Sequence, residues 1–253
     1  MQHIDAALLK KQISDRVAQA RPEKIPGEIV AIVVPASIRG ASEDLVSRVY
    51  RNLVGERYDA AIVINSGTAE IAGRIHICAG ETYATPLGPV EIFDRIRQEL
   101  CDEEDDIFVS DAGHFRDDGA IVQLPYLMEV LDRFRVVPVV MGDESPEFCR
   151  ELGAAIGEVT YSQRSIVVAA VEVVSCTSET LLEFRKSLQE CDIPRTMRIV
   201  QSESVKLRGA GPLLSTMIAA SRRGADNIRI IDILSPEAGG SGGVGAIFWR
   251  GQG

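Results

Sequence analysis

The sequence contains 253 residues, of which 45% are hydrophobic and 25% are charged, and its formal net charge is −10. These proportions are typical of an ordinary soluble globular protein, and the length suits one large α/β domain or two small ones. The acidic balance excludes a general affinity for nucleic acids and for anionic membrane surfaces, because both require a basic face. We therefore expect no nucleic-acid partner and no membrane partner.

The cysteines and the first residues indicate where the protein works. Five cysteines are widely spaced and include no C-x-x-C pair, as is typical of free thiols in a reducing compartment, so we expect a cytoplasmic location. Residues 4–20 carry apolar side chains at helical spacing without a continuous apolar run, which predicts an amphipathic helix and not a signal peptide. We expect one domain over 1–253, in which 1–26 is this helix and a linker.

Apolar strands alternate with helices along the rest of the chain. We expect strands over 29–34, 59–65, 107–110, 136–140, 165–171, 227–234 and 244–250, an edge strand over 74–78 and an extended segment over 196–202. Ser42 should cap a helix that continues to Leu53, and Pro89 should lie in the first turn of a helix to Leu100. Further helices are expected from residue 122 to the strand at 136 and over 146–156, 178–189 and 209–223.

The alternation of strands and helices predicts an α/β fold with a mostly parallel central sheet between helical layers. The strand at 136–140 consists almost wholly of valine, so it should be covered on both faces. Strands 227–234 and 244–250 are joined by too few residues for a crossover helix. They should therefore form an antiparallel C-terminal hairpin at one edge of the sheet.

Ligands of open α/β sheets bind beyond the carboxyl ends of the strands. Here those ends carry residues 35–40, 65–70, 142–145 and 172–177, and the helix that starts at Gly209 should point its N-terminus at the same edge. We expect these segments to form the walls of one cleft. Lys206–Pro212 is suited to a phosphate or carboxylate, and Glu172, at a buried strand end, requires a partner.

Two groups of potential metal ligands stay open to two interpretations. Asp111, His114, Asp117 and Asp118 have a spacing that suits a metal site, but a polar surface loop has the same composition. His76 and Cys78 would lie on one side of a strand, where they are either soft ligands or ordinary packing residues.

Three segments, in order, resemble the MEMO-like family, whose fold is shared with class III extradiol dioxygenases. Thr85–Val90 (TPLGPV) is similar to the family's T-P-L-G-x-V, and Val122–Leu127 (VQLPYL) resembles the end of its E-H-S-x-E-x-Q-L-P-F-L. Arg208–Leu214 (RGAGPLL) is similar to its C-G-x-G-P-[IL]. The resemblance covers residues 27–250. It implies a metal or redox site, and it implies partnership with the other two proteins of the AmmeMemoRadiSam set, one of them a radical-SAM enzyme.

The sequence departs from the family at the positions that would hold the metal. Ala36 stands at the histidine of P-H-A-G-Y, Thr68 at the histidine of G-P-S-H, and Arg208 at the cysteine of C-G-x-G-P. Residues 117–121 and 169–174 likewise lack the histidines of E-H-S-x-E and S-S-D-x-S-H. Alanine and arginine do not ligate iron, copper or zinc, so we expect no metal and no cofactor.

The replaced positions suggest two states of the cleft. Either Glu172 pairs with an arginine and seals the pocket, or Arg39 and Arg208 face an anionic ligand, because a buried cation needs a counter-charge. We therefore predict a non-catalytic binding or assembly protein with no assigned catalytic residue. Its candidate ligand-binding residues are Arg39, Ser66, Thr68, Glu172, Cys176, Arg208 and Gly209.

Two enzymatic alternatives remain. The first is a metal-independent hydrolase or transferase, with Thr68 or Cys176 as nucleophile, His114 as base, and the two arginines holding a carboxylate or phosphate. Such a cysteine needs a base within hydrogen-bonding distance and a lowered pKa. The second alternative retains a metal ion at His76, Cys78 or His114.

Overall fold

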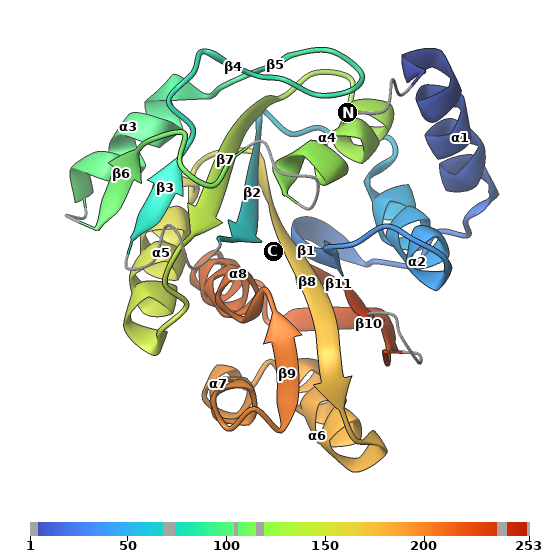
Figure 1. Ribbon diagram of the computed structural model, residues 1–253, viewed down its shortest axis with the longest axis vertical. Helices are drawn as coiled ribbons and strands as arrows, with labels where there is room; N and C mark the ends of the chain where they lie inside the picture. The colour runs from blue at the N-terminus through green and yellow to red at the C-terminus, as the bar shows by residue number, and fades with distance from the viewer. Residues whose placement is uncertain (1–4, 68–73, 104–105, 115–118, 237–241, 252–253) are drawn as a thin grey trace.

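A twisted sheet with helices on both faces forms the body of the protein in this computed structural model (Figure 1). The structure describes residues 5–67, 74–103, 106–114, 119–236 and 242–251. Within these ranges, no helix has the length and apolar character needed to cross a lipid bilayer.

Four parallel strands form the centre of the sheet, in the order β1 (Gly27–Pro35), β8 (Ser165–Cys176), β2 (Ala60–Ser66) and β7 (Arg135–Met141). Beyond β1, the sheet continues antiparallel with β11 (Gly243–Gly251) and then β10 (Asn227–Leu234). The mostly parallel centre and the C-terminal edge hairpin are therefore confirmed. On the other side, β3 (Ile75–Ile77) runs antiparallel to β7, and β6 (Ile107–Val109) forms the edge.

Alternate residues of each central strand enter the hydrophobic cores on opposite faces of the sheet, as a period of two requires. One core contains Ile32 and Val34 of β1 and is covered by α1 (Ala6–Gln19), α2 (Ala41–Tyr50) and α4 (Ala120–Val130). The other contains Ala31 and Val33 and is covered by α3 (Asp94–Glu103), α5 (Pro146–Val159), α6 (Ser178–Gln189), α7 (Ile193–Gln201) and α8 (Ala210–Arg222).

Two segments differ from the predicted secondary structure because tertiary pairing or capping decides their state. Pro89 does not begin a helix: Val90 pairs with Tyr83 in the hairpin of β4 (Thr82–Tyr83) and β5 (Val90–Glu91), so α3 begins only at Asp94. The segment predicted as extended over 196–202 lies in α7. Asp192 caps this helix by accepting a hydrogen bond from the Arg195 N–H at 2.9 Å.

Three further expectations were wrong in position. The segment 74–78 is not an edge strand, because β3 lies between β7 and β6. Ser42 does not cap α2; the N-cap residue is Gly40, whose φ is 57°. The strand β8 does not stop at residue 171 but continues to Cys176, where it pairs with β9 (Val205–Arg208), a strand that we did not predict (Figure 1). Glu172 and Cys176 therefore lie in a strand and not in a loop.

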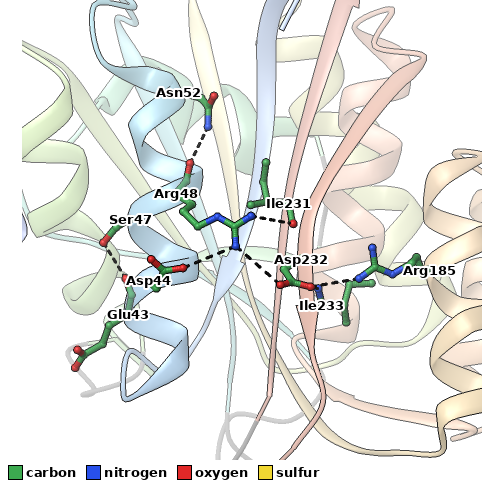
Figure 2. A network of polar contacts seen from close by, with 9 residues as sticks. All are labelled: Glu43, Asp44, Ser47, Arg48, Asn52, Arg185, Ile231, Asp232 and Ile233. Atoms are coloured by element: carbon green, nitrogen blue, oxygen red, sulfur yellow. Dashed lines mark hydrogen bonds and ion pairs between the residues drawn. The ribbon is translucent and has the colours of Figure 1, made fainter. Parts of the chain in front are cut away.

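The edge strand β10 carries a carboxylate, Asp232, that pairs with arginines from helices on both faces of the sheet. Asp232 lies 3.3 Å from Arg185 of α6 and 3.9 Å from Arg48 of α2, and Figure 2 shows the two arginines approaching it from opposite sides. Arg48 also donates to the backbone carbonyl of Ile231 at 3.4 Å. Such half-exposed pairs add little to stability, but charged groups along an edge strand hinder its pairing with a foreign strand.

The Q-L-P-Y segment has a structural role beneath the loop that follows β1. Gln123 is fully buried; its Oε1 accepts from the Tyr50 hydroxyl at 3.1 Å, and its Nε2 donates to the Pro35 carbonyl at 2.9 Å. The ring of Tyr126 stacks on that of Tyr50 with centroids 5.2 Å apart. Because buried polar groups require partners, this network fixes the backbone where the carboxyl end of β1 turns toward the site.

Candidate functional site

The carboxyl ends of β1 and β2 lie beside β8 around one small cavity. Its lining residues are Ala36, Asn65, Ser66, Ala170 and Arg208. Strand register brings them together: Pro35 lies beside Val171, and the Ala36 N–H donates to the Val171 carbonyl at 3.2 Å. We call this space the carboxyl-edge cavity.

The carboxyl-edge cavity is very small. Its volume is about 10 Å³, which accommodates about one water molecule and no metabolite. The Asn65 side chain belongs to its wall and is only 3% exposed. Neither atom of the Asn65 amide has a hydrogen-bond partner in the part of the chain that the structure describes.

Arg208 is held by an acidic side chain of the same chain. Residues 172 and 208 are directly opposite each other in the antiparallel β8–β9 pair, and Arg208 Nη2 lies 2.7 Å from Glu172 Oε2. The Glu172 side chain is 14% exposed and that of Arg208 is 41% exposed. Of the two predicted states of the cleft, this geometry matches the one in which Glu172 pairs with an arginine.

The other arginine, Arg39, does not line the carboxyl-edge cavity. It is exposed in the turn before α2, where its backbone carbonyl accepts from the Ser42 N–H at 3.2 Å. The two arginines therefore do not form one cation-lined cleft. Thr68 lies outside the described residues.

The N-terminus of α8 holds a carboxylate that we did not predict there. Gly211 donates its backbone N–H to Glu144 Oε2 at 2.8 Å, and Ser66 Oγ donates to Glu144 Oε1 at 2.5 Å. From the sequence, Lys206–Pro212 is suited to the phosphate or carboxylate of a ligand. The structure instead places the carboxylate of the protein's own Glu144 in that position. A signal for it exists in the sequence, because residues 142–145 follow β7 at the same edge as the glycine-rich start of α8.

Two glycines make this arrangement sterically possible. Gly209 has a φ of 95°, and a Cβ on it would lie 2.3 Å from the Ala170 carbonyl oxygen. A Cβ on Gly211 would lie 2.8 Å from Glu144 Cγ. Any larger residue at either position would thus displace the backbone of β8 or the Glu144 side chain.

Cys176 and His114 do not form a catalytic pair. Cys176 lines a separate groove of about 520 Å³ beside the start of α6, and burial raises the pKa of its thiol. His114 Nε2 lies 3.3 Å from the His76 carbonyl oxygen of β3. Because β2 and β7 lie between β8 and β3, the two strands are on the order of 14 Å apart. A nucleophilic thiolate would need a nearby base and a lowered pKa.

Two of the potential metal ligands near β3, Asp117 and Asp118, lie outside the described residues, and those that the structure describes contact each other in part. Cys78 Sγ donates to Asp111 Oδ1 at 3.4 Å, and burial raises the pKa of this thiol to about 11. Burial also lowers the pKa of His114 to about 4. Across the described ranges, no three histidine, cysteine, aspartate or glutamate side chains gather closely enough to hold a metal ion.

The donor set of the carboxyl-edge cavity does not suit a transition metal. The methyl group of Ala36 supplies no ligand atom, Arg208 is a cation, and Glu172 is engaged by Arg208. The residues that the structure describes around this cavity therefore do not fit the metal site that the sequence resemblance implies.

A larger groove lies at the opposite edge of the sheet. Its volume is about 670 Å³, and it opens at the amino ends of β2 and β7 between the β4–β5 hairpin and the end of α4. Pro89, Met128 and Asp132 are among its lining residues. It is separate from the carboxyl ends of the strands, where ligands of such sheets bind.

Comparison with known proteins identifies relatives across most of the chain. The model of the Memo-like protein family matches residues 3–236. A MEMO1 family protein of Saccharolobus islandicus is 27% identical over 212 residues, which cover 80% of this chain and 75% of the relative. One of Sulfurisphaera tokodaii is 23% identical over 233 residues, covering 85% and 82%. One of Nitrosopumilus maritimus is 20% identical over 182 residues, covering 70% of this chain and 66% of the relative.

Among solved structures, an uncharacterized protein of Escherichia coli K12, JW3007, shares the fold. The TM-score is 0.61 at 14% identity, and the match covers 87% of this chain and 99% of that one. At this identity the similarity concerns the fold alone.

The Glu172–Arg208 pair predicts an asymmetric response to substitution. R208A should destabilise the protein by about 1–3 kcal/mol because it leaves the largely covered Glu172 carboxylate without its arginine. E172A should cost less, because the more exposed Arg208 can turn toward water. Urea unfolding measures the free energy of unfolding of both variants. Equal decreases relative to the wild type would show that the pair lacks this asymmetry.

The lowered pKa of His114 predicts a stability change between about pH 6.5 and pH 4. In this range the unfolded chain binds a proton at His114 that the folded chain does not, so this contribution is complete above pH 6.5 and is lost as the pH falls toward 4. The free energy of unfolding should therefore fall more steeply with acidification in the wild type than in H114Q. Identical pH profiles of the two proteins would contradict the assignment.

Proposed function

The chain belongs to the Memo-like protein family, and we propose that it is a member that has lost the family's metal site and acts as a non-catalytic binding or assembly protein. The position of the family's cysteine is taken by Arg208, and that of its first histidine by Ala36. Both residues line a cavity of about 10 Å³. The single observation that carries the proposal is the 2.7 Å ion pair between Glu172 and Arg208. In this pair the carboxylate of Glu172 neutralises the charge of Arg208 at the cavity.

The segments that resemble the family have structural roles in this chain, which agrees with a scaffold that lacks metal chemistry. Thr85 Oγ1 accepts from the Leu87 N–H at 3.1 Å and donates to the Gly88 carbonyl at 2.6 Å, so the T-P-L-G motif builds a turn. Gln123 of the Q-L-P motif supports the loop after β1. These retained residues form the fold, whereas the substitutions fall at positions where the family would bind an ion.

The retained fold with so small a cavity favours a role through protein surfaces. From the family resemblance, we propose that the partners are the other two proteins of the AmmeMemoRadiSam set. The chain would then contribute a surface to the assembly, and the chemistry would belong to a partner.

Elemental analysis tests the loss of the metal site. Protein purified from cells grown with added iron, copper and zinc should contain far less than one equivalent of any of them, because the cavity offers an aliphatic group and a cation where ligands are required. A stoichiometric metal that survives dialysis would overturn the proposal.

Co-expression tests the assembly role. The tagged chain should retain both AmmeMemoRadiSam partners of the same organism through affinity purification and gel filtration. The control is the chain expressed with the partners of an unrelated organism. If the native partners elute separately at micromolar concentrations, the chain does not act by assembly with them.

A further inference from the structure

We propose that the groove at the amino ends of β2 and β7 binds a small zwitterion with apolar side chains, of the size and chemistry of a dipeptide. We call this space the amino-edge groove; its volume is about 670 Å³. The inference goes beyond the proposed function and does not rest on it, because this groove is separate from the carboxyl-edge cavity.

Three segments of the chain form the amino-edge groove. Figure 1 shows the β4–β5 hairpin beside α4, at the end of the sheet where β2 and β7 begin. The hairpin supplies residues 89–91, the end of α4 supplies Met128 and Leu131, and residues 132–135 lead into β7. The volume lies within the range of roughly 300–1,000 Å³ that small-molecule sites occupy, whereas the carboxyl-edge cavity holds about one water molecule.

Five charged side chains line the amino-edge groove, and they carry both signs. They are the carboxylates of Asp59, Glu91 and Asp132 and the guanidinium groups of Arg133 and Arg135. Within the described part of the chain, none of the five takes part in an ion pair or a side-chain hydrogen bond. The groove therefore offers positive and negative groups that are both available to a ligand.

Arginines at other places on this protein pair with carboxylates. Arg16 lies 2.6 Å from Glu43, and Arg250 lies 2.7 Å from Glu28. A ligand at those places would first have to break an internal ion pair. A ligand in the amino-edge groove meets no such competition, so a larger share of its interaction energy contributes to affinity.

Arg135 is restrained at the groove before any ligand binds. Its backbone N–H donates to the Asp59 carbonyl at 3.1 Å, and its guanidinium carbon lies 3.5 Å from the centre of the Phe93 ring. Stacking on an aromatic ring restrains a guanidinium but leaves the N–H donors in its plane free for the oxygens of an anion. With the exposed Arg133 beside it in the lining, the groove is suited to a carboxylate.

The other charges of the groove favour a cation. The three carboxylates outnumber the two guanidinium groups. The groove also includes Leu131, the C-cap residue of α4, and the last carbonyl groups of a helix carry partial negative charge. An ammonium group is therefore stabilised in the same groove that holds a carboxylate, and a zwitterion satisfies both requirements.

Apolar side chains complete the lining and determine the rest of the ligand. Met128 and Phe134 are half-buried, so part of each remains accessible, and Pro89 is exposed beside them in the lining. An inorganic anion or a simple amine would leave this apolar surface in water. A dipeptide with aliphatic side chains covers the apolar surface and also presents both charges.

Titration with leucyl-leucine, followed by two-dimensional NMR of the protein, tests the proposal. Backbone amide signals should shift saturably, with a dissociation constant on the order of 0.1–1 mM. N-acetyl-leucyl-leucine lacks the ammonium group, and leucyl-leucinamide lacks the carboxylate. Each should bind about 3- to 10-fold more weakly, because one set of charged groups is left without its partner. Glycyl-glycine keeps both charges without the apolar side chains and should also bind more weakly.

Variants assign the two charges of the ligand to the groove. R133A and D132N change exposed side chains of the lining. R133A should bind leucyl-leucine about 3- to 10-fold more weakly and should no longer distinguish it from leucyl-leucinamide. D132N should distinguish it less from the acetylated peptide than the wild type does. The matched controls, R198A on α7 and E183Q on α6, change exposed residues outside the groove and should bind like the wild type.

Several results would overturn the site. It is wrong if leucyl-leucine causes no saturable shifts, if both blocked peptides bind as tightly as leucyl-leucine, or if R133A binds like R198A. Should R133A prove unstable, R133K keeps the charge, and R133Q, which removes it, must then bind more weakly than R133K. Metal content and partner capture are measured without peptide, so the proposed function and this inference fail independently.

Discussion

The arrangement of the site follows from one constraint: charges at the convergent ends of parallel strands need opposite charges or hydrogen-bond donors within the same chain. β1 and β2 end at the carboxyl-edge cavity, and β8 passes it before pairing with β9. The Glu172 side chain is only 14% exposed there, so its charge would be costly without a partner. The protein meets this requirement twice, by pairing Glu172 with Arg208 and by placing Glu144 between Ser66 and the start of α8.

Under the proposed loss of the metal site, these two contacts stabilise the scaffold of the family in the absence of an ion. An alanine or arginine in place of a metal ligand leaves space and charge that must be compensated. Here β8 continues beyond the sheet and pairs with β9, which brings Glu172 opposite Arg208. The compensation is therefore built into the register of two strands, and the remaining cavity of about 10 Å³ has no room for a substrate.

Much of the fold follows from the sequence because the hydrophobic period is unambiguous in the central strands. The valine-rich strand at 136–140 and its parallel neighbours are apolar on both faces, and the short 234–244 connection permits only a hairpin. The misplaced elements are those that a cap or a cross-strand pair decides. The segment 196–202 becomes helical through the cap at Asp192, and Val90 becomes a strand residue because Tyr83 lies opposite.

The candidate site was predictable only in part for the same reason. That Ala36 and Ser66 approach one another follows from their positions at strand ends, and Arg208 was expected nearby because it precedes the helix that starts at Gly209. The position of Arg39 depends on the turn before α2. The partner of Arg208 depends on β9, whose apolar–polar alternation (VKLR) spans only four residues and was missed. Glu144 was missed because the glycine-rich start of α8 suggests an external anion, and only tertiary structure shows which carboxylate of the chain reaches it.

The most direct test of the account is an anomalous-scattering map of crystals grown from protein expressed with iron, copper and zinc. Data are collected at the absorption edge of each metal. The account predicts no anomalous peak within the carboxyl-edge cavity, with Glu172 in contact with Arg208. A strong peak there, with the guanidinium of Arg208 turned away and a coordination shell of protein ligands, would contradict it.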